Sequence, residues 1–100
     1  MTKNYCKTAA NWWAKKIQKT ESKPIRGLEL FEERLSSQIN YLTSINGTLA
    51  ISTLYSSSKL LDEIAFYSGL TANIPSGYEM RIFFNNIFVY NSYGELVANF

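Results

Sequence analysis

The chain has 100 residues, of which 46% are hydrophobic and 18% charged, and its formal net charge is +2. This length accommodates a single hydrophobic core, and this hydrophobic content excludes an intrinsically disordered chain. The charge is uneven, because residues 1–26 carry seven bases and one acid whereas residues 27–100 carry three bases and seven acids. We therefore expect one domain over residues 1–100, with a basic face near its N-terminus.

Two amphipathic helices are predicted in the first half of the chain. Residues 4–19 place apolar side chains at helical spacing around Trp13. Residues 27–43 carry a more regular apolar stripe, with glutamates on the opposite side of the helix. The polar segment around Pro24 is the predicted linker between these two helices.

A strand and a third helix are predicted after the break at Asn46-Gly47. Residues 48–55 alternate and are rich in β-branched side chains, which is typical of a strand. A run of serines ending at Ser58 favours an N-cap for a helix over residues 59–68, and Gly69 is well placed to end that helix.

The last quarter of the chain is predicted to be a β meander. Residues 78–84 alternate between core-facing and outward side chains. Asn85-Asn86 is the predicted two-residue hairpin turn, because Asn tolerates the positive φ that such turns require. Residues 87–91 and 96–100 are the two strands that follow.

The predicted fold class is α+β, with the element order ααβαβββ and an antiparallel sheet that has helices packed on one face. Residues 1–45 form a helical half, and residues 46–100 form a strand, a helix and the meander. The expected core combines side chains from both halves: Phe31, Leu35, Ile39, Leu42, Ile64, Ile82 and Val89.

Residues suited to catalysis are scarce. The chain has no histidine, which removes the commonest general base and the commonest metal ligand. Cys6 lies on the apolar face of the first helix, where a buried hydrophobic role is expected. Glu29, Glu32 and Glu33 are expected to solvate the polar face of the second helix. We therefore expect a protein that is not an enzyme and that has no metal and no cofactor.

The cysteine content and the N-terminus bear on location. Cys6 is the only cysteine, so no intramolecular disulfide can form, and small secreted domains usually need disulfides. The N-terminal segment lacks an apolar stretch of signal-peptide length, and no apolar run approaches a membrane span. We expect a cytoplasmic protein that does not contact a membrane.

The first helix contains the best candidate for a binding site. Trp12 and Trp13 point about 100° apart on a helix, and Trp13 completes the apolar stripe. Trp12 is then displaced toward solvent, among an aromatic neighbour and three lysines. The predicted partner-binding patch, called the α1 patch below, is Tyr5, Trp12, Lys15, Lys16 and Lys19. In the alternative interpretation both tryptophans are buried between the helix and the sheet, and Lys16 extends past them.

Three segments carry a resemblance to known proteins: ANWWAKKI over residues 10–17, the LELFEERL helix that follows, and the tail IPSGYEMRIFFNNIFVYNSYG. In these the chain resembles small uncharacterised proteins of phages and mobile elements of low-GC Gram-positive bacteria, a group that includes anti-CRISPR proteins. The resemblance implies a small, single-domain, partner-binding protein in the cytoplasm of a bacterial host. Many anti-CRISPR proteins are strongly acidic mimics of nucleic acid, and a net charge of +2 departs from that pattern.

Two functions are therefore weighed. The first is a non-enzymatic inhibitor of a host defence system, which binds a host protein such as a CRISPR effector nuclease. The second is a small nucleic-acid-binding or regulatory protein that uses the basic face of the N-terminal helix. A protein partner is favoured because residues 27–100 have an excess of acidic residues and no RNP, KH or helix-turn-helix signature is recognisable.

Overall fold

The computed structural model describes residues 2–100, over which the chain forms three helices and four strands. In chain order these elements are α1 (Asn4–Gln18), α2 (Leu28–Asn46), β1 (Thr48–Ser52), α3 (Lys59–Ser68), β2 (Tyr78–Phe83), β3 (Asn86–Asn91) and β4 (Leu96–Asn99). The order confirms the predicted ααβαβββ arrangement of an α+β domain. Two elements differ in length from the prediction, because α2 continues to the turn at Gly47 and β1 ends at Ser52.

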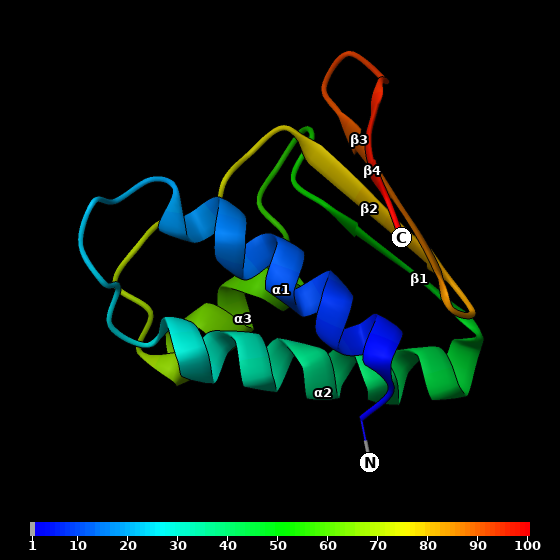
Figure 1. Ribbon diagram of the computed structural model, residues 1–100, viewed down its shortest axis with the longest axis horizontal. Helices are drawn as coiled ribbons and strands as arrows, with labels where there is room; N and C mark the ends of the chain where they lie inside the picture. Colours follow the sequence, from blue (N-terminus) through cyan, green and yellow to red (C-terminus); the bar gives the residue numbers. More distant parts are fainter. Residues whose placement is uncertain (1) are drawn as a thin grey trace.

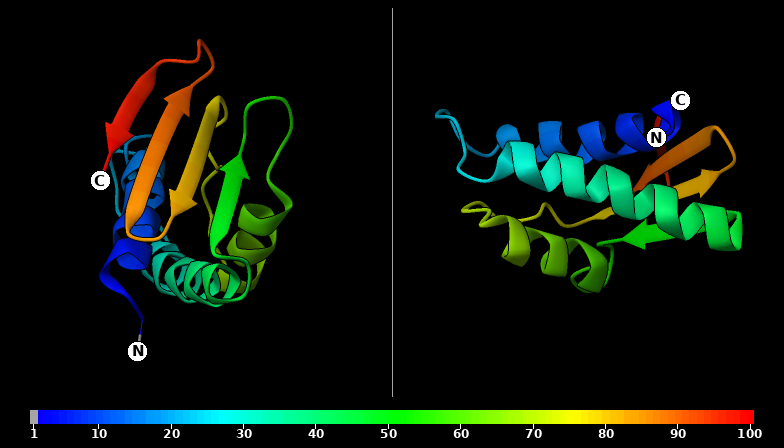
Figure 2. Two further views of the ribbon diagram at one scale, coloured as in Figure 1. Left: turned by 90° about the vertical axis from the view of Figure 1, so that its right-hand side faces the viewer. Right: turned by 90° about the horizontal axis from the view of Figure 1, so that it is seen from below.

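The four strands form one antiparallel sheet in the order β1-β2-β3-β4, so β1 and β4 are its two edges. The registers of β1 with β2 and of β2 with β3 are continuous, and Met80 lies opposite both Ile51 and Val89. The register of β3 with β4 shifts between Val89 and Tyr90, which marks a β-bulge. The helices form a second layer beneath this sheet (Figures 1 and 2).

Alternation along the strands decides which face of the sheet is buried. Met80 and Ile82 of β2 have no exposed surface, whereas their neighbours Arg81 and Phe83 are exposed. This two-residue period places every second side chain against the helices. Of the predicted core residues, all are buried except Leu42, which is half-buried in the last turns of α2. Leu42 is therefore less buried than predicted.

The turn between β2 and β3 lies one residue earlier than predicted. Phe83 pairs with Asn86, so Phe84 and Asn85 are the turn residues, with φ of 29° and 36°. Positive φ at both central positions matches the twist of a two-residue hairpin. The prediction of Asn85-Asn86 was wrong because strand pairing, rather than residue preference, determines where the turn falls. Phe84 consequently adopts a backbone conformation that is uncommon for a bulky side chain.

Close backbone contact joins the start of α2 to the end of α3. Gly27 has φ of 82°, and a β-carbon placed on it would lie 2.6 Å from the carbonyl oxygen of Ser68. The backbone amide of Thr71 also donates to the carbonyl of Arg26 over 3.2 Å. Only glycine allows this approach, because it has no β-carbon and tolerates positive φ.

Substitution of Gly27 tests this contact. Gly27→Ala introduces both a positive-φ residue and a backbone clash, so we expect a loss of about 2–5 kcal/mol in the free energy of unfolding. Gly94→Ala is the matched control, because Gly94 has φ of 77° and open space around its missing β-carbon. This control should lose only about 1–2 kcal/mol. Equal losses for the two variants in urea denaturation would contradict the close contact.

Candidate functional site

Helix α1 lies against both α2 and the sheet, and Trp13 is central to this packing. Trp13 is fully buried, as predicted, together with Cys6, Ala10 and Ile17 of the same apolar stripe. Its indole ring meets the ring of Tyr78, at the start of β2, edge-on at 6.4 Å between centroids. The helix is therefore held in place by a large aromatic side chain inserted between the two layers.

Trp12 lies at the border of this core. It is half-buried, and its ring makes edge-on contacts with Trp13 at 5.0 Å and with Tyr78 at 5.1 Å between centroids. The ammonium group of Lys16 lies 5.4 Å from the centroid of the Trp12 ring and 5.2 Å from that of Tyr78. Such distances allow cation–π attraction, so Trp12, Lys16 and Tyr78 form one cluster.

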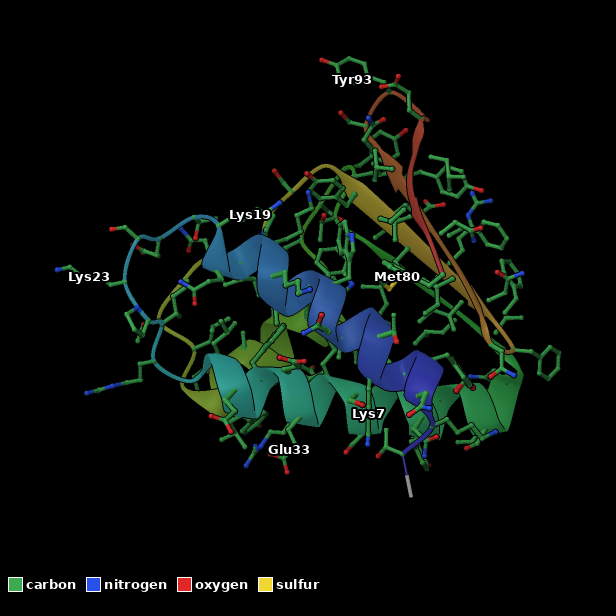
Figure 3. All side chains as sticks on the ribbon, in the orientation of Figure 1. Lys7, Lys19, Lys23, Glu33, Met80 and Tyr93 are labelled. Atoms are coloured by element: carbon green, nitrogen blue, oxygen red, sulfur yellow. The ribbon has the colours of Figure 1, made fainter. Side chains whose placement is uncertain are left out.

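The other members of the α1 patch lie apart from this cluster. Tyr5 is half-buried near the other end of α1, and its hydroxyl shares a hydrogen bond of 3.1 Å with the hydroxyl of Thr43 on α2. Lys15 and Lys19 are exposed. Figure 3 shows Lys19 at the C-terminal end of α1, beside the linker from which Lys23 extends. The structure thus brings Trp12 and Lys16 together and places Tyr5 against α2.

The acidic face of α2 has a partly structural role. Glu32 accepts a hydrogen bond of 3.0 Å from the side-chain amide of Asn11, which links α2 to α1. Glu29 and Glu33 are exposed. Within residues 2–100, no group of three or more His, Cys, Asp or Glu side chains is arranged to hold a metal ion.

The thiol of Cys6 is enclosed by the core. Burial raises its pKa above the ordinary value, although hydrogen bonding with Tyr5 and Thr43 opposes the shift. At neutral pH the raised pKa lowers the already small fraction of thiolate, which is the nucleophilic form. Cys6 therefore contributes to the core as a small hydrophobic side chain.

A second surface is the outer sheet face, which is turned away from the helices. We define it by Glu79, Arg81, Phe83, Phe88 and Tyr90, whose side chains alternate with the buried ones along β2 and β3. Phe83 and Phe88 form an edge-on pair with 6.3 Å between ring centroids. The guanidinium of Arg81 forms an ion pair with Glu79 and lies 5.4 Å from the ring centroid of Tyr90. The outer sheet face is thus aromatic, and its one acid and one base neutralise each other.

This face is hollowed at the end away from the Phe84 turn. A pocket of about 420 Å³ lies there between the loop after β1 and the turn before β4, and Arg81 and Tyr90 contribute to its lining. Tyr55 lines the same pocket and is 98% exposed. Tyr93 extends from the tip of the β3–β4 turn, whereas Met80 points toward α1 on the opposite face (Figure 3). Aromatic side chains therefore surround as well as occupy the outer sheet face.

The outer sheet face was not among the sites predicted from the sequence. One signal was present, because residues 87–90 are apolar without interruption, which indicates a strand with apolar side chains on both faces. A second was Phe83, which shares its alternation with the charged residues Glu79 and Arg81. Uncovered apolar surface of this kind commonly marks an interaction site.

Comparison of the chain with protein-family models, with curated proteins and with solved structures returns no match. Across residues 2–100, no helix has both the length and the apolar character needed to cross a bilayer. The case for a function therefore depends on the chemistry of the α1 patch and of the outer sheet face.

Alanine substitution at the two tryptophans tests the packing of α1. Trp13→Ala leaves a cavity in the core and should lower the free energy of unfolding by about 3–5 kcal/mol. Trp12→Ala removes contacts from a half-buried ring and should cost about 1–2 kcal/mol, including its cation–π contact with Lys16. Thermal and urea denaturation of both variants measure these losses. A larger loss for Trp12→Ala than for Trp13→Ala would contradict this placement of α1.

Proposed function

We propose that the protein acts by binding another protein, without catalysing a reaction, and that the outer sheet face is its contact surface. The observation that supports this proposal is the aromatic outer face of the sheet, where exposed Phe83 and half-buried Phe88 and Tyr90 lie around the Arg81–Glu79 ion pair. Aromatic and arginine side chains are the residues that most often contribute large binding energies at protein interfaces.

The charge of this surface favours a protein over a nucleic acid. Binding to a phosphate backbone depends on several uncompensated lysine or arginine side chains. On the outer sheet face the only base, Arg81, is already paired with Glu79. A partner of matching chemistry is a protein with an exposed apolar patch and few charges at its centre. The aromatic rings would be the anchors, and the polar residues at the rim would exclude water.

The biological role that we propose is inhibition of a host defence system in the cytoplasm of a bacterium. The resemblance to small phage and mobile-element proteins supports this role and makes a CRISPR effector nuclease the first partner to test. A net charge of +2 argues against inhibition by mimicry of DNA. Inhibition would instead be steric, with the bound protein covering a surface that the nuclease needs for nucleic-acid loading or cleavage.

The test measures binding and inhibition with purified CRISPR effector nucleases from low-GC Gram-positive hosts. Wild-type protein should form a stoichiometric complex and suppress DNA cleavage. Phe83→Ala and Tyr90→Ala should each weaken binding by about 2 kcal/mol or more, because each removes an aromatic anchor. Tyr67→Ala is the matched control, since Tyr67 is an exposed aromatic on α3, remote from the outer sheet face, and is 69% exposed.

Three outcomes would count against parts of the proposal. Equal weakening by Tyr67→Ala would show that loss of any exposed aromatic is enough, which contradicts a specific contact surface. Weakening by Trp12→Ala alone would move the contact to the α1 patch. Absence of a stoichiometric protein partner, both with these nucleases and in capture from the bacterial host, would contradict protein binding altogether.

One observation favours the alternative function, nucleic-acid binding or regulation by α1. This helix contains no acidic residue, and Lys7 and Lys15 of the helix and Lys19 at its C-cap are exposed. If these lysines contact phosphates, affinity for DNA or RNA falls steeply with salt concentration. The double variant Lys15→Gln with Lys19→Gln would then reduce the slope of log affinity against log salt by about two. A salt-insensitive interaction would exclude this alternative.

A further inference from the structure

The stretch from the middle of α2 to the start of α3 has an unusual composition. Residues 35–58 contain no Asp, Glu, Lys or Arg, although 18% of the whole chain is charged. This stretch includes the C-terminal half of α2, the edge strand β1 and the loop after it. Surfaces of monomeric proteins usually mix charges of both signs, which keeps two copies from associating.

Strand β1 is an edge without protection. Its residues, TLAIS, include no charged side chain and no proline, and its register with β2 shows no bulge. The other edge differs, because β4 carries a bulge where it pairs with β3. Charges, prolines and bulges are the usual means by which proteins prevent an edge strand from pairing with another chain. An edge that lacks all three is suited to pairing.

Helix α2 offers apolar surface next to this edge. The groove between α2 and α3 is lined on the α2 side by residues between Leu30 and Gln38. Figure 2 shows α3 beside the N-terminal half of α2, with β1 beyond the end of α3. The same stripe of α2 continues past the groove with Tyr41 and Ile45, which are 58% and 59% exposed. Helix α2 also contacts β1, and Figure 2 shows β1 on the side of α2 that α3 occupies further along the helix.

We propose that β1 pairs with β1 of a second copy of this chain, in an antiparallel arrangement with two-fold symmetry centred on Ala50. Thr48 then lies opposite Ser52 of the second copy, so the side chains that meet on the outer face are small and uncharged. On the helix face, Tyr41 and Ile45 of the two copies approach each other. The pairing joins two sheets into one that is twice as wide.

The second copy is favoured over other occupants by self-complementarity. In a two-fold interface the same patch meets itself, so a charged patch would repel its own copy. Residues 35–58, which include β1 and the C-terminal half of α2, contribute no charged side chain to such a patch. The proposal does not depend on the proposed function, because the outer sheet face is left uncovered and is presented twice.

The test is the molar mass of the full chain in solution, measured by sedimentation equilibrium over a range of micromolar concentrations. Wild-type protein should have twice the chain mass. Ala50→Glu should favour the monomer, because two carboxylates meet at the two-fold axis, and raise the dissociation constant about a hundredfold or more. Within one chain the new carboxylate lies opposite Arg81, so the fold should accept it. Ile45→Glu, at an exposed helical position, should act in the same direction.

Val97→Glu on β4 is the matched control, and this variant should remain dimeric with the affinity of the wild-type chain. A wild-type chain that is monomeric at about 200 μM, where a dimer of ordinary micromolar affinity would form, overturns the proposal. Dimers that persist in Ala50→Glu and Ile45→Glu, or that dissociate only in Val97→Glu, overturn it as well. Circular dichroism of each variant shows whether a change in mass accompanies unfolding. If Ala50→Glu or Ile45→Glu unfolds, Tyr41→Glu replaces it. Tyr41→Glu should also be monomeric, and a dimer of this variant would overturn the proposal.

Discussion

The packing of α1 across the inner face of the sheet is the interaction on which the rest of the structure depends. Trp13 is fully buried where α1, α2 and β2 meet, and it contacts Tyr78 on β2. Burial of an indole ring of about 200 Å² stabilises a fold by roughly 5 kcal/mol, which is a large share of the stability of a small domain. Trp13 therefore contributes strongly to holding α1 on this face of the sheet.

A single core leaves surface uncovered in a domain of this size. Three helices form one layer, so one face of the four-stranded sheet is buried while Phe83, Phe88 and Tyr90 stay on the other. The C-terminal end of α2 is also uncovered, because it extends past α3, and Tyr41 and Ile45 are exposed there. Both surfaces carry aromatic or aliphatic side chains where a monomer would ordinarily place charged ones. Their apolar character is consistent with a protein that works through its contacts.

The two surfaces differ in chemistry, and different roles are proposed for them. The outer sheet face combines rings with an internal ion pair, a mixture suited to a foreign protein surface. The β1 edge is without charge and offers backbone hydrogen bonds, which suits a second copy of the same strand. A paired sheet would present two outer faces in one assembly and would raise the avidity for a partner with repeated sites.

Local signals in the sequence were sufficient to predict the elements and much of the core. Ser58 caps α3 by accepting a hydrogen bond from the amide of Leu61, and Gly69 ends that helix with φ of 68°, as their residue types indicate. The errors arose where tertiary contacts decide the outcome. Strand pairing moved the β2–β3 turn to Phe84-Asn85. Contact with Tyr78 on β2 leaves Trp12 half-buried, which is intermediate between the two interpretations that the sequence left open. Neither strand pairing nor a contact between distant segments can be read from the local spacing of residues.

The outer sheet face was predicted to be free of helices, but it was not recognised as a candidate binding site. An apolar run such as residues 87–90 indicates a strand with two apolar faces, and such runs are typical of parallel sheets that are covered on both faces. The helices lie on one side of the sheet, as predicted, and the alternation of buried side chains along β3 places Phe88 and Tyr90 on the other side. The proposal that they bind a partner depends on surface chemistry, for which no sequence pattern is specific.

The central claim is that helices cover one face of the sheet and leave the other open, and solvent paramagnetic relaxation measured by NMR tests it most directly. A soluble paramagnetic agent should strongly broaden the ring signals of exposed Phe83, and less strongly those of half-buried Tyr90, on the outer sheet face. The side-chain signals of Met80, Ile82 and Val89 should be protected, because these residues have no exposed surface. Equal protection of the two sets, or stronger broadening of Met80 than of Tyr90, would contradict the account.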